Sequence, residues 1–428
     1  MLRGISNIFK VKELREKVLI TIGLLLVYRF GAYLPVPGIP FQDMLEAFRS
    51  NAATNGALAV LNLFSGGALS RVSVFALGIM PYITAQIIFQ MMQAVIPSLQ
   101  ALAQEGESGQ RKITQYTRYL TVVLALINSI GYLFLFKSSS YGLSFNDMGF
   151  PSWIEDLIIV GCLETGAIII MWLGEVMTQR GIGNGMSLII FVNIMSGLPQ
   201  ALIQSMQGMD HGMIITAITV VVILVIIPII VYIERGQRRI PIQYAKRVVG
   251  KRIMGAQATY LPIKVNTAGV VPIIFASSIL YFPAQIAVFF PDVEWMQNFA
   301  NTIASGWVNW VLSVLLIVFF AYFYTSMVFN PEETADQLRK AGGFIPGVRP
   351  GKATAEYIQN VLNRITLPGA VFMAAIAVVP SIIFSFTGNQ LVQSFGGTSI
   401  LIMVGVAMDT ISQLESQLKM HNYDGFFK

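Results

Sequence analysis

Charged residues are scarce in this sequence. Only 12% of its 428 residues are Asp, Glu, Lys or Arg, whereas 55% are hydrophobic. Soluble domains carry about 25% charged residues, so a soluble chain of this length would need far more polar surface than this one can supply. The composition excludes a single soluble domain and, because disorder requires low hydrophobicity, a disordered chain. It indicates a protein that crosses a membrane several times.

Cysteine and histidine are almost missing. The one cysteine, Cys162, cannot form a disulfide within the chain or build a zinc site from several cysteines. The two histidines, His211 and His421, supply too little for a His-ligated metal or a Ser-His-Asp triad. The segment 347–352 resembles a phosphate-binding loop, but its spacing is one residue short and no Ser or Thr follows the lysine. We therefore predict no catalytic residue, no metal and no cofactor, and we do not expect an enzyme.

Long apolar runs are abundant. A helix needs about 20 mostly apolar residues to cross a bilayer. Ten runs of roughly this kind are present: 18–34, 72–96, 118–136, 157–177, 187–207, 213–233, 268–290, 307–329, 366–386 and 398–416. With the N-terminus in the cytoplasm, nearly all of the 28 Lys and Arg residues fall in cytoplasmic segments, which is the usual bias of membrane proteins. The sequence therefore predicts ten spans, both termini in the cytoplasm, and a first span that is retained rather than cleaved as a signal peptide.

The loop at 208–213 separates five spans from the next five. With an odd number of spans in each half, two similar halves would be inverted relative to each other. We predict an N-terminal half at 1–207 and a C-terminal half at 208–428, which carries two long basic cytoplasmic loops at 234–265 and 330–365. Their dense Gly and Pro residues favour shaped loops. Such loops either only fix the topology or also dock an anionic partner, such as RNA, lipid headgroups or an acidic protein surface.

One apolar segment, at about 57–70, is too short to cross the membrane. Irregular backbone survives at membrane depth only where protein or a watery cavity surrounds it. Two interpretations therefore stay open at this point. The segment is either re-entrant and buried in the protein, or an amphipathic helix on the outer surface.

Polar residues inside the spans suggest further hypotheses. Arg29, near the outer end of the first span, is expected to extend its side chain to the interface. Glu164 in the fourth span would suit a transporter coupled to protons or sodium. Thr84 in the second span and Ser277 and Ser278 in the seventh are expected to face each other or water, because lipid would not favour them.

Short motifs follow one another along nearly the whole chain. They are LNLFSGGALSR at 61–71, FALGIMPYI at 75–83, GE at 174–175 with RGIGNG at 180–185, ERGQRRIP at 234–241, FASS at 275–278, FNPEETAD at 329–336, PGVRPG at 346–351 and FGGTS at 395–399. In sequence and in order they closely resemble those of the SecY/Sec61-alpha family, which supplies the channel subunits of Sec preprotein translocases. The match is specific because it involves both halves of the chain.

The resemblance implies an all-α polytopic membrane protein. Its ten transmembrane helices would form a clam-shell of two inverted five-helix halves with a re-entrant plug helix. The plug would include Leu61, Asn62, Leu63, Phe64, Ser65, Gly66 and Gly67. The constriction would be a ring of six isoleucines: Ile79, Ile83, Ile190, Ile194, Ile274 and Ile402. An apolar ring of this kind gates by dewetting and carries no fixed charge that favours an ion.

The resemblance also implies a lateral gate and a docking surface. The gate would open between the second and seventh spans, beside Thr84 and Phe282. The basic loops would dock the SecA motor and the ribosome through Arg239, Lys246, Lys251, Arg252 and Arg349. Lys251 stands where arginine is expected, which keeps the charge but loses the planar guanidinium.

The implied function is that of a passive channel in the cell (cytoplasmic) membrane. It would translocate unfolded secretory proteins and release membrane-protein helices laterally, driven by a bound motor or ribosome. Its partners would be the SecE and SecG subunits, SecA, the ribosome, signal peptides, unfolded preproteins and membrane lipids. Two alternatives are a secondary transporter of small solutes, which would depend on Glu164, and a membrane insertase without a crossing channel.

Overall fold

A computed structural model of the chain describes residues 11–40, 61–62, 64–137, 150–207, 212–244, 247–249, 252–254, 258–287, 289–290, 293–304, 306–385 and 396–424. Within these residues, each of the ten predicted spans contains a helix. The helices are α2 (Lys12–Gly31), α5 (Met80–Val95), α7 (Glu107–Lys137), α8 (Ser152–Arg180), α9 (Gly185–Gln207), α10 (Gly212–Glu234), α11 (Val271–Ala287), α13 (Gly306–Val328), α15 (Lys352–Ser385) and α17 (Gly397–Asp424). Three shorter helices are α6 (Pro97–Gln104), α12 (Glu294–Ala304) and α14 (Pro331–Lys340).

The described helices differ in how well they suit a membrane. Six are long and apolar enough to cross one, namely α7, α8, α10, α13, α15 and α17. The first part of α9, as far as Pro199, and the whole of α11 are apolar but shorter.

The second predicted span is helical only from Met80 onward. Residues 72–79 form turns, in which Val72 and Gly78 have positive φ angles of 43° and 58°. The helix then starts with Pro81 in its first turn, where proline has no hydrogen bond to lose. An apolar run alone does not distinguish a helix from buried irregular backbone, so the span was predicted too long at this end.

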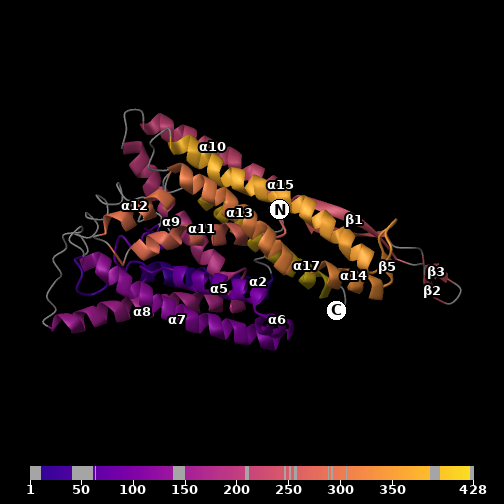
Figure 1. The fold of residues 1–428 in the computed structure, drawn as a ribbon, viewed down its shortest axis with the longest axis horizontal. Helices are drawn as coiled ribbons and strands as arrows, with labels where there is room; N and C mark the ends of the chain where they lie inside the picture. The colour runs from indigo at the N-terminus through magenta and orange to yellow at the C-terminus, as the bar shows by residue number, and fades with distance from the viewer. Residues whose placement is uncertain are drawn as a thin grey trace.

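The helices form two groups, as Figure 1 shows. On one side α5 packs on α7, α7 on α8, and α2 and α9 on α8; on the other, α11 packs on α13, α13 on α15, and α15 and α10 on α17. Among the described helices, the main contacts between the two groups are in two places. One is the contact of α9 with α10 and α17, and the other is the contact of α11 with α5 and α7.

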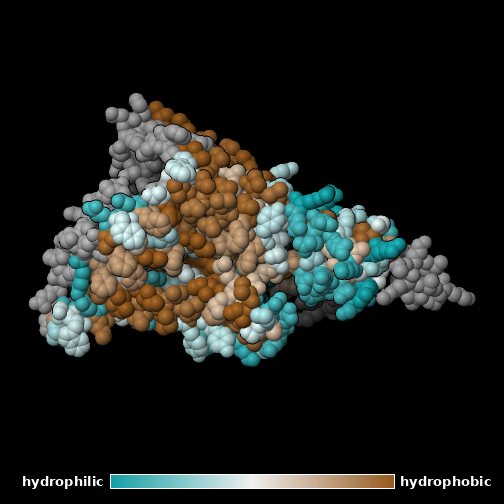
Figure 2. Space-filling view, in the orientation of Figure 1, coloured by the Kyte–Doolittle hydropathy of each residue, from teal (hydrophilic) through white to brown (hydrophobic). Residues whose placement is uncertain are grey.

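The surface divides into an apolar belt and a hydrophilic end. In Figure 2 the belt covers the middle of the molecule, and the hydrophilic end carries α14 and the strands β1 (Gln237–Tyr244) and β5 (Gly343–Phe344). On α10 the exposed side chains include Ile218, Val221, Leu224 and Val225. An apolar surface of this extent is unsuitable for water and fits contact with lipid. We call the hydrophilic end the loop end.

The two long basic loops fold together at the loop end. Strand β1 (Gln237–Tyr244) pairs antiparallel with β4 (Ala258–Lys264) and, at its far end, with β5 (Gly343–Phe344). A separate ribbon joins β2 (Arg247–Val249) to β3 (Arg252–Met254). Beneath the larger sheet lies a small apolar cluster that includes Ile240, Ile345 and Ile358. The segment 330–365, expected as a loop, also contains α14 and the first turns of α15.

The short apolar segment is buried in the protein. Its described part begins at Leu61 and excludes Leu63; residues 57–60 lie outside the described residues. Leu61, Phe64, Ala68 and Leu69 are each at most 4% exposed. Burial on this scale favours the re-entrant interpretation over a helix on the outer surface.

Candidate functional site

The six isoleucines predicted for the constriction lie in one apolar cluster. They come from α5 and its N-cap, α9, α11 and α17, and none is more than 6% exposed: Ile79, Ile83, Ile190, Ile194, Ile274 and Ile402. Phe64 of the short segment belongs to the same cluster. The ring of Phe64 lies 5.4 Å from that of Tyr281 on α11. The structure therefore brings Phe64 of the predicted plug together with the six residues predicted for the ring.

The short segment is held in shape by its own hydrogen bonds. Ser65 Oγ donates to the Asn62 carbonyl at 3.0 Å and accepts from the Leu69 amide at 3.1 Å. The Asn62 side chain accepts from the Ser70 amide at 3.0 Å. Between them, Gly66 and Gly67 have φ angles of 66° and 81°, a conformation that glycine adopts without strain. The polar residues of the motif thus close a compact turn.

Side chains from α2 and α9 contact the backbone of this turn. Asn193 Nδ2 donates to the Phe64 carbonyl at 2.6 Å, and Tyr28 Oη donates to Asn193 Oδ1 at 2.7 Å. Arg29 Nη1 donates to the Gly66 carbonyl at 2.9 Å. Arg29 therefore binds the backbone of the turn, a contact that the sequence did not indicate. Its guanidinium also lies 5.3 Å from the centre of the Tyr33 ring.

Tyr28 and Asn193 were not singled out from the sequence. The available signal was the amide of Asn193 itself, which stands beside Ile194 in the otherwise apolar stretch 188–195. Buried polar side chains in membrane spans need a partner. Only the fold reveals that this partner is the backbone 129 residues earlier in the chain.

The two helices predicted to form the lateral gate, α5 and α11, are in contact. Thr84 is half-buried on α5, and its hydroxyl donates to the Met80 carbonyl at 3.0 Å. Phe282 on α11 is 47% exposed. Ser277 and Ser278 are buried. Their hydroxyls donate to carbonyls of their own helix, that of Ser277 to Ile273 at 2.7 Å and that of Ser278 to Ile274 at 2.8 Å. Of the two surroundings expected for these serines, their burial excludes water, and their own helix satisfies their hydroxyls.

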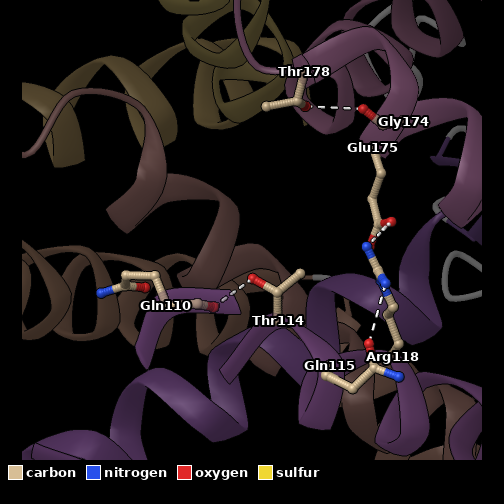
Figure 3. Close-up of polar contacts among 7 residues, drawn as sticks. All are labelled: Gln110, Thr114, Gln115, Arg118, Gly174, Glu175 and Thr178. Atoms are coloured by element: carbon tan, nitrogen blue, oxygen red, sulfur yellow. Dashed lines mark hydrogen bonds and ion pairs between the residues drawn. The ribbon is translucent and has the colours of Figure 1, made fainter. Parts of the chain in front are cut away.

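The GE and RGIGNG motifs build the junction of α8 and α9, close to α7 (Figure 3). Glu175 on α8 forms a two-point ion pair with Arg118 on α7. Thr178 Oγ1 donates to the Gly174 carbonyl and accepts from the Gly185 amide. Gly183 has a φ of 76°. The RGIGNG motif thus forms the tight turn between α8 and α9.

Basic side chains project from the loop end. Arg239 on β1 is exposed and borders an open hollow of about 430 Å³ with Gln237, Thr259, Tyr260 and Pro262. Arg349 is exposed in the turn before α15, and its carbonyl accepts a hydrogen bond from Thr354 Oγ1. Arg252 lies on β3. Lys246 and Lys251 lie outside the described residues.

The comparisons with known proteins agree with this arrangement. A family model described as SecY matches residues 73–411. The protein translocase subunit SecY of Streptomyces coelicolor is 45% identical over 442 residues, which cover 100% of both chains. The subunit of the same name from Mycobacterium tuberculosis is 44% identical over 443 residues, again with 100% of both chains covered. The relatives give no support to a transporter of small solutes.

Solved structures share the fold. A protein-conducting channel superposes with a TM-score of 0.62 at 17% identity, over 94% of this chain and 92% of that one. Sec61 from a canine ribosome-channel complex gives a TM-score of 0.57 at 15% identity, over the same shares of the two chains. These likenesses confirm the ten-helix channel architecture predicted from the motifs. Because its relatives match it from end to end and the family model covers most of its length, the chain belongs to the SecY family.

Proposed function

We propose that the chain forms the central subunit of a channel that translocates unfolded secretory proteins and releases membrane-protein helices laterally. One observation carries this function: six isoleucines from four parts of the fold share an apolar cluster with Phe64 of the buried re-entrant segment. An apolar constriction excludes water and ions when closed. Its branched side chains can also surround a passing chain of any sequence.

The re-entrant segment, whose described part is 61–62 and 64–70, acts as the plug, and the six isoleucines act as the ring. The lateral gate opens between α5 and α11, beside Thr84 and Phe282. The halves 1–207 and 208–428 move about the contact of α9 with α10. Their two contact regions support this assignment, because α9 meets α10 and α17 in one place and α11 meets α5 and α7 in the other.

The loop end is the docking surface for the SecA motor and the ribosome. Its support is the exposed Arg239 and Arg349 on loops joined into one sheet. Two of the solved relatives are channels in ribosome complexes. The curated relatives are translocase subunits, so SecE and SecG are proposed to complete the complex. The chain then lies in the cell membrane. Its loop end and both termini face the cytoplasm.

A cross-linking experiment tests the passage of polypeptide through the ring. Cys162 is replaced by serine, Ile274 by cysteine, and a secretory precursor with one cysteine is stalled during transport into reconstituted vesicles. We expect a disulfide between the precursor and position 274. The control is Leu315→Cys in the same background, because Leu315 is 61% exposed on α13 and faces lipid.

Two results would contradict the proposal. If precursor is transported but does not cross-link at position 274, the chain does not pass through the predicted ring. If positions 274 and 315 cross-link equally well, contact at 274 is not specific to a pore.

A further inference from the structure

Asn193 is a polar side chain of α9 that links the plug to its own helix and, through Tyr28, to α2. It is 0% exposed, and a buried amide is costly unless its polar atoms find hydrogen-bond partners. Its nitrogen donates to the Phe64 carbonyl and its oxygen accepts from the Tyr28 hydroxyl. Because a carbonyl can only accept, the orientation of the amide is fixed by Phe64.

Tyr28 is in turn fixed by its own packing. Its side chain is 0% exposed, and its ring stacks on that of Phe75 at 5.7 Å with an angle of 10° between the planes. The hydroxyl therefore has little freedom to leave Asn193. Arg29, the next residue on α2, adds a second hydrogen bond to the plug at the Gly66 carbonyl.

The fit around the amide is close. A Cβ atom added to Gly66 would lie 2.5 Å from Asn193 Oδ1, which is nearer than real Cβ contacts come. The plug thus approaches α9 at a point where only glycine leaves room for the amide. Such an approach is expected of a specific contact rather than of general packing.

Asn193 also moves with the ring. Ile190 lies three residues before Asn193 and four before Ile194 on α9, and residues three and four apart lie on one face of a helix, so Ile190 shares a face with each of them. A displacement of α9 that widens the constriction therefore withdraws the amide from Phe64. A donor and an acceptor about 3.6 Å apart no longer form a hydrogen bond, so a shift of about one ångström breaks a bond of 2.6 Å.

We propose that Asn193, oriented by Tyr28, is the latch that holds the plug in the closed channel and that widening of the ring at α9 releases it. This inference rests on the proposed roles of the plug and the ring. Asn193 acts on the plug backbone, and Tyr28 is a positioning residue that acts through Asn193.

Ion leak through the complete, resting translocase in vesicles measures the latch. Asn193→Ala removes both hydrogen bonds, and we expect the leak to rise about tenfold, the effect of losing a buried hydrogen bond on an equilibrium. Tyr28→Phe removes only the hydroxyl and keeps the stacked ring, so its leak should rise less. The double variant should leak no more than Asn193→Ala alone. Ser129→Ala is the control, because it removes a buried hydroxyl on α7 whose hydrogen bond stays within its own helix.

A second readout separates the latch from a general loss of structure. A precursor with a weakened signal sequence should be transported faster by Tyr28→Phe and Asn193→Ala than by the unchanged channel, because opening costs less. A merely damaged channel would transport it more slowly, and that result would overturn the proposal.

Deleting residues 61–70 tests the plug separately. If the deletion leaks but Asn193→Ala and Tyr28→Phe do not, the plug stands and the latch is wrong. If the deletion does not leak either, the proposed plug is itself wrong and the latch fails with it.

Discussion

Arg118 and Glu175 form a two-point ion pair that ties α7 to α8. Arg118 Nε lies 2.8 Å from Glu175 Oε1, and Arg118 Nη2 lies 2.7 Å from Oε2. The Glu175 side chain is only 12% exposed, while that of Arg118 is 35% exposed. Gln115 accepts a further hydrogen bond from Arg118, as Figure 3 shows. The pair lies beside the turn that leads into α9, which carries Asn193.

Breaking this pair should destabilise the N-terminal group of helices. Glu175→Gln leaves Arg118 without its partner charge, and we expect a loss of about 1–3 kcal/mol, below the value for fully buried pairs because Arg118 is partly exposed. The melting temperature of the purified complex measures the loss. Glu107→Gln is the matched control, since its pair with Arg111 is 84% and 79% exposed. Equal melting temperatures for both variants would show that the Glu175 pair contributes nothing.

Gly66→Ala should open the resting channel. The new Cβ would collide with Asn193 Oδ1, and the φ of 66° is unfavourable for alanine. We expect ion leak to rise as the plug is displaced. Gly106→Ala carries a similar backbone strain at a φ of 79°, but nothing lies within 4 Å of its Cβ, and its leak should stay at the basal value. A Gly66→Ala channel as tight as the unchanged one would refute the close contact.

Reversing charge at the loop end should weaken docking. Arg239→Glu and Arg349→Glu each place a negative charge where an anionic partner is expected, so binding of ribosomes and of the SecA motor should fall, most strongly at low salt. Co-sedimentation with vesicles measures both. Arg339→Glu is the control. Arg339 lies in the same loop as Arg349, but it already pairs with Asp336 at 3.3 Å. Loss of binding in all three variants alike would indicate a general charge effect.

A signal peptide should contact the seam between α5 and α11. In a Cys162→Ser background, a cysteine at Thr84 or Phe282 is expected to cross-link to a cysteine in the signal peptide of a stalled precursor. Phe319→Cys serves as the comparison, since Phe319 is 53% exposed on α13, away from the seam. Cross-links at Phe319 but at neither seam position would place the gate elsewhere.

The sequence was sufficient for the spans because bilayer thickness fixes the length of an apolar helix. It was not sufficient where apolar residues fold as turns, as between Val72 and Gly78, since hydrophobicity is the same in both cases. It also did not predict that β5 pairs with β1 across about 100 residues of chain, or that the amide of Asn193 meets the plug. Such contacts depend on how distant segments are brought together, which no local pattern records.

The hydrogen bonds that reach the plug from α2 and α9 both end on backbone carbonyls, those of Phe64 and Gly66. Every amino acid offers the same carbonyl. The plug can therefore accumulate side-chain changes over evolutionary time without losing these two attachments, provided that position 66 stays glycine. Selection would then act on the shape of the plug backbone more strictly than on its chemistry, and a plug transplanted from a divergent relative could still be held in place.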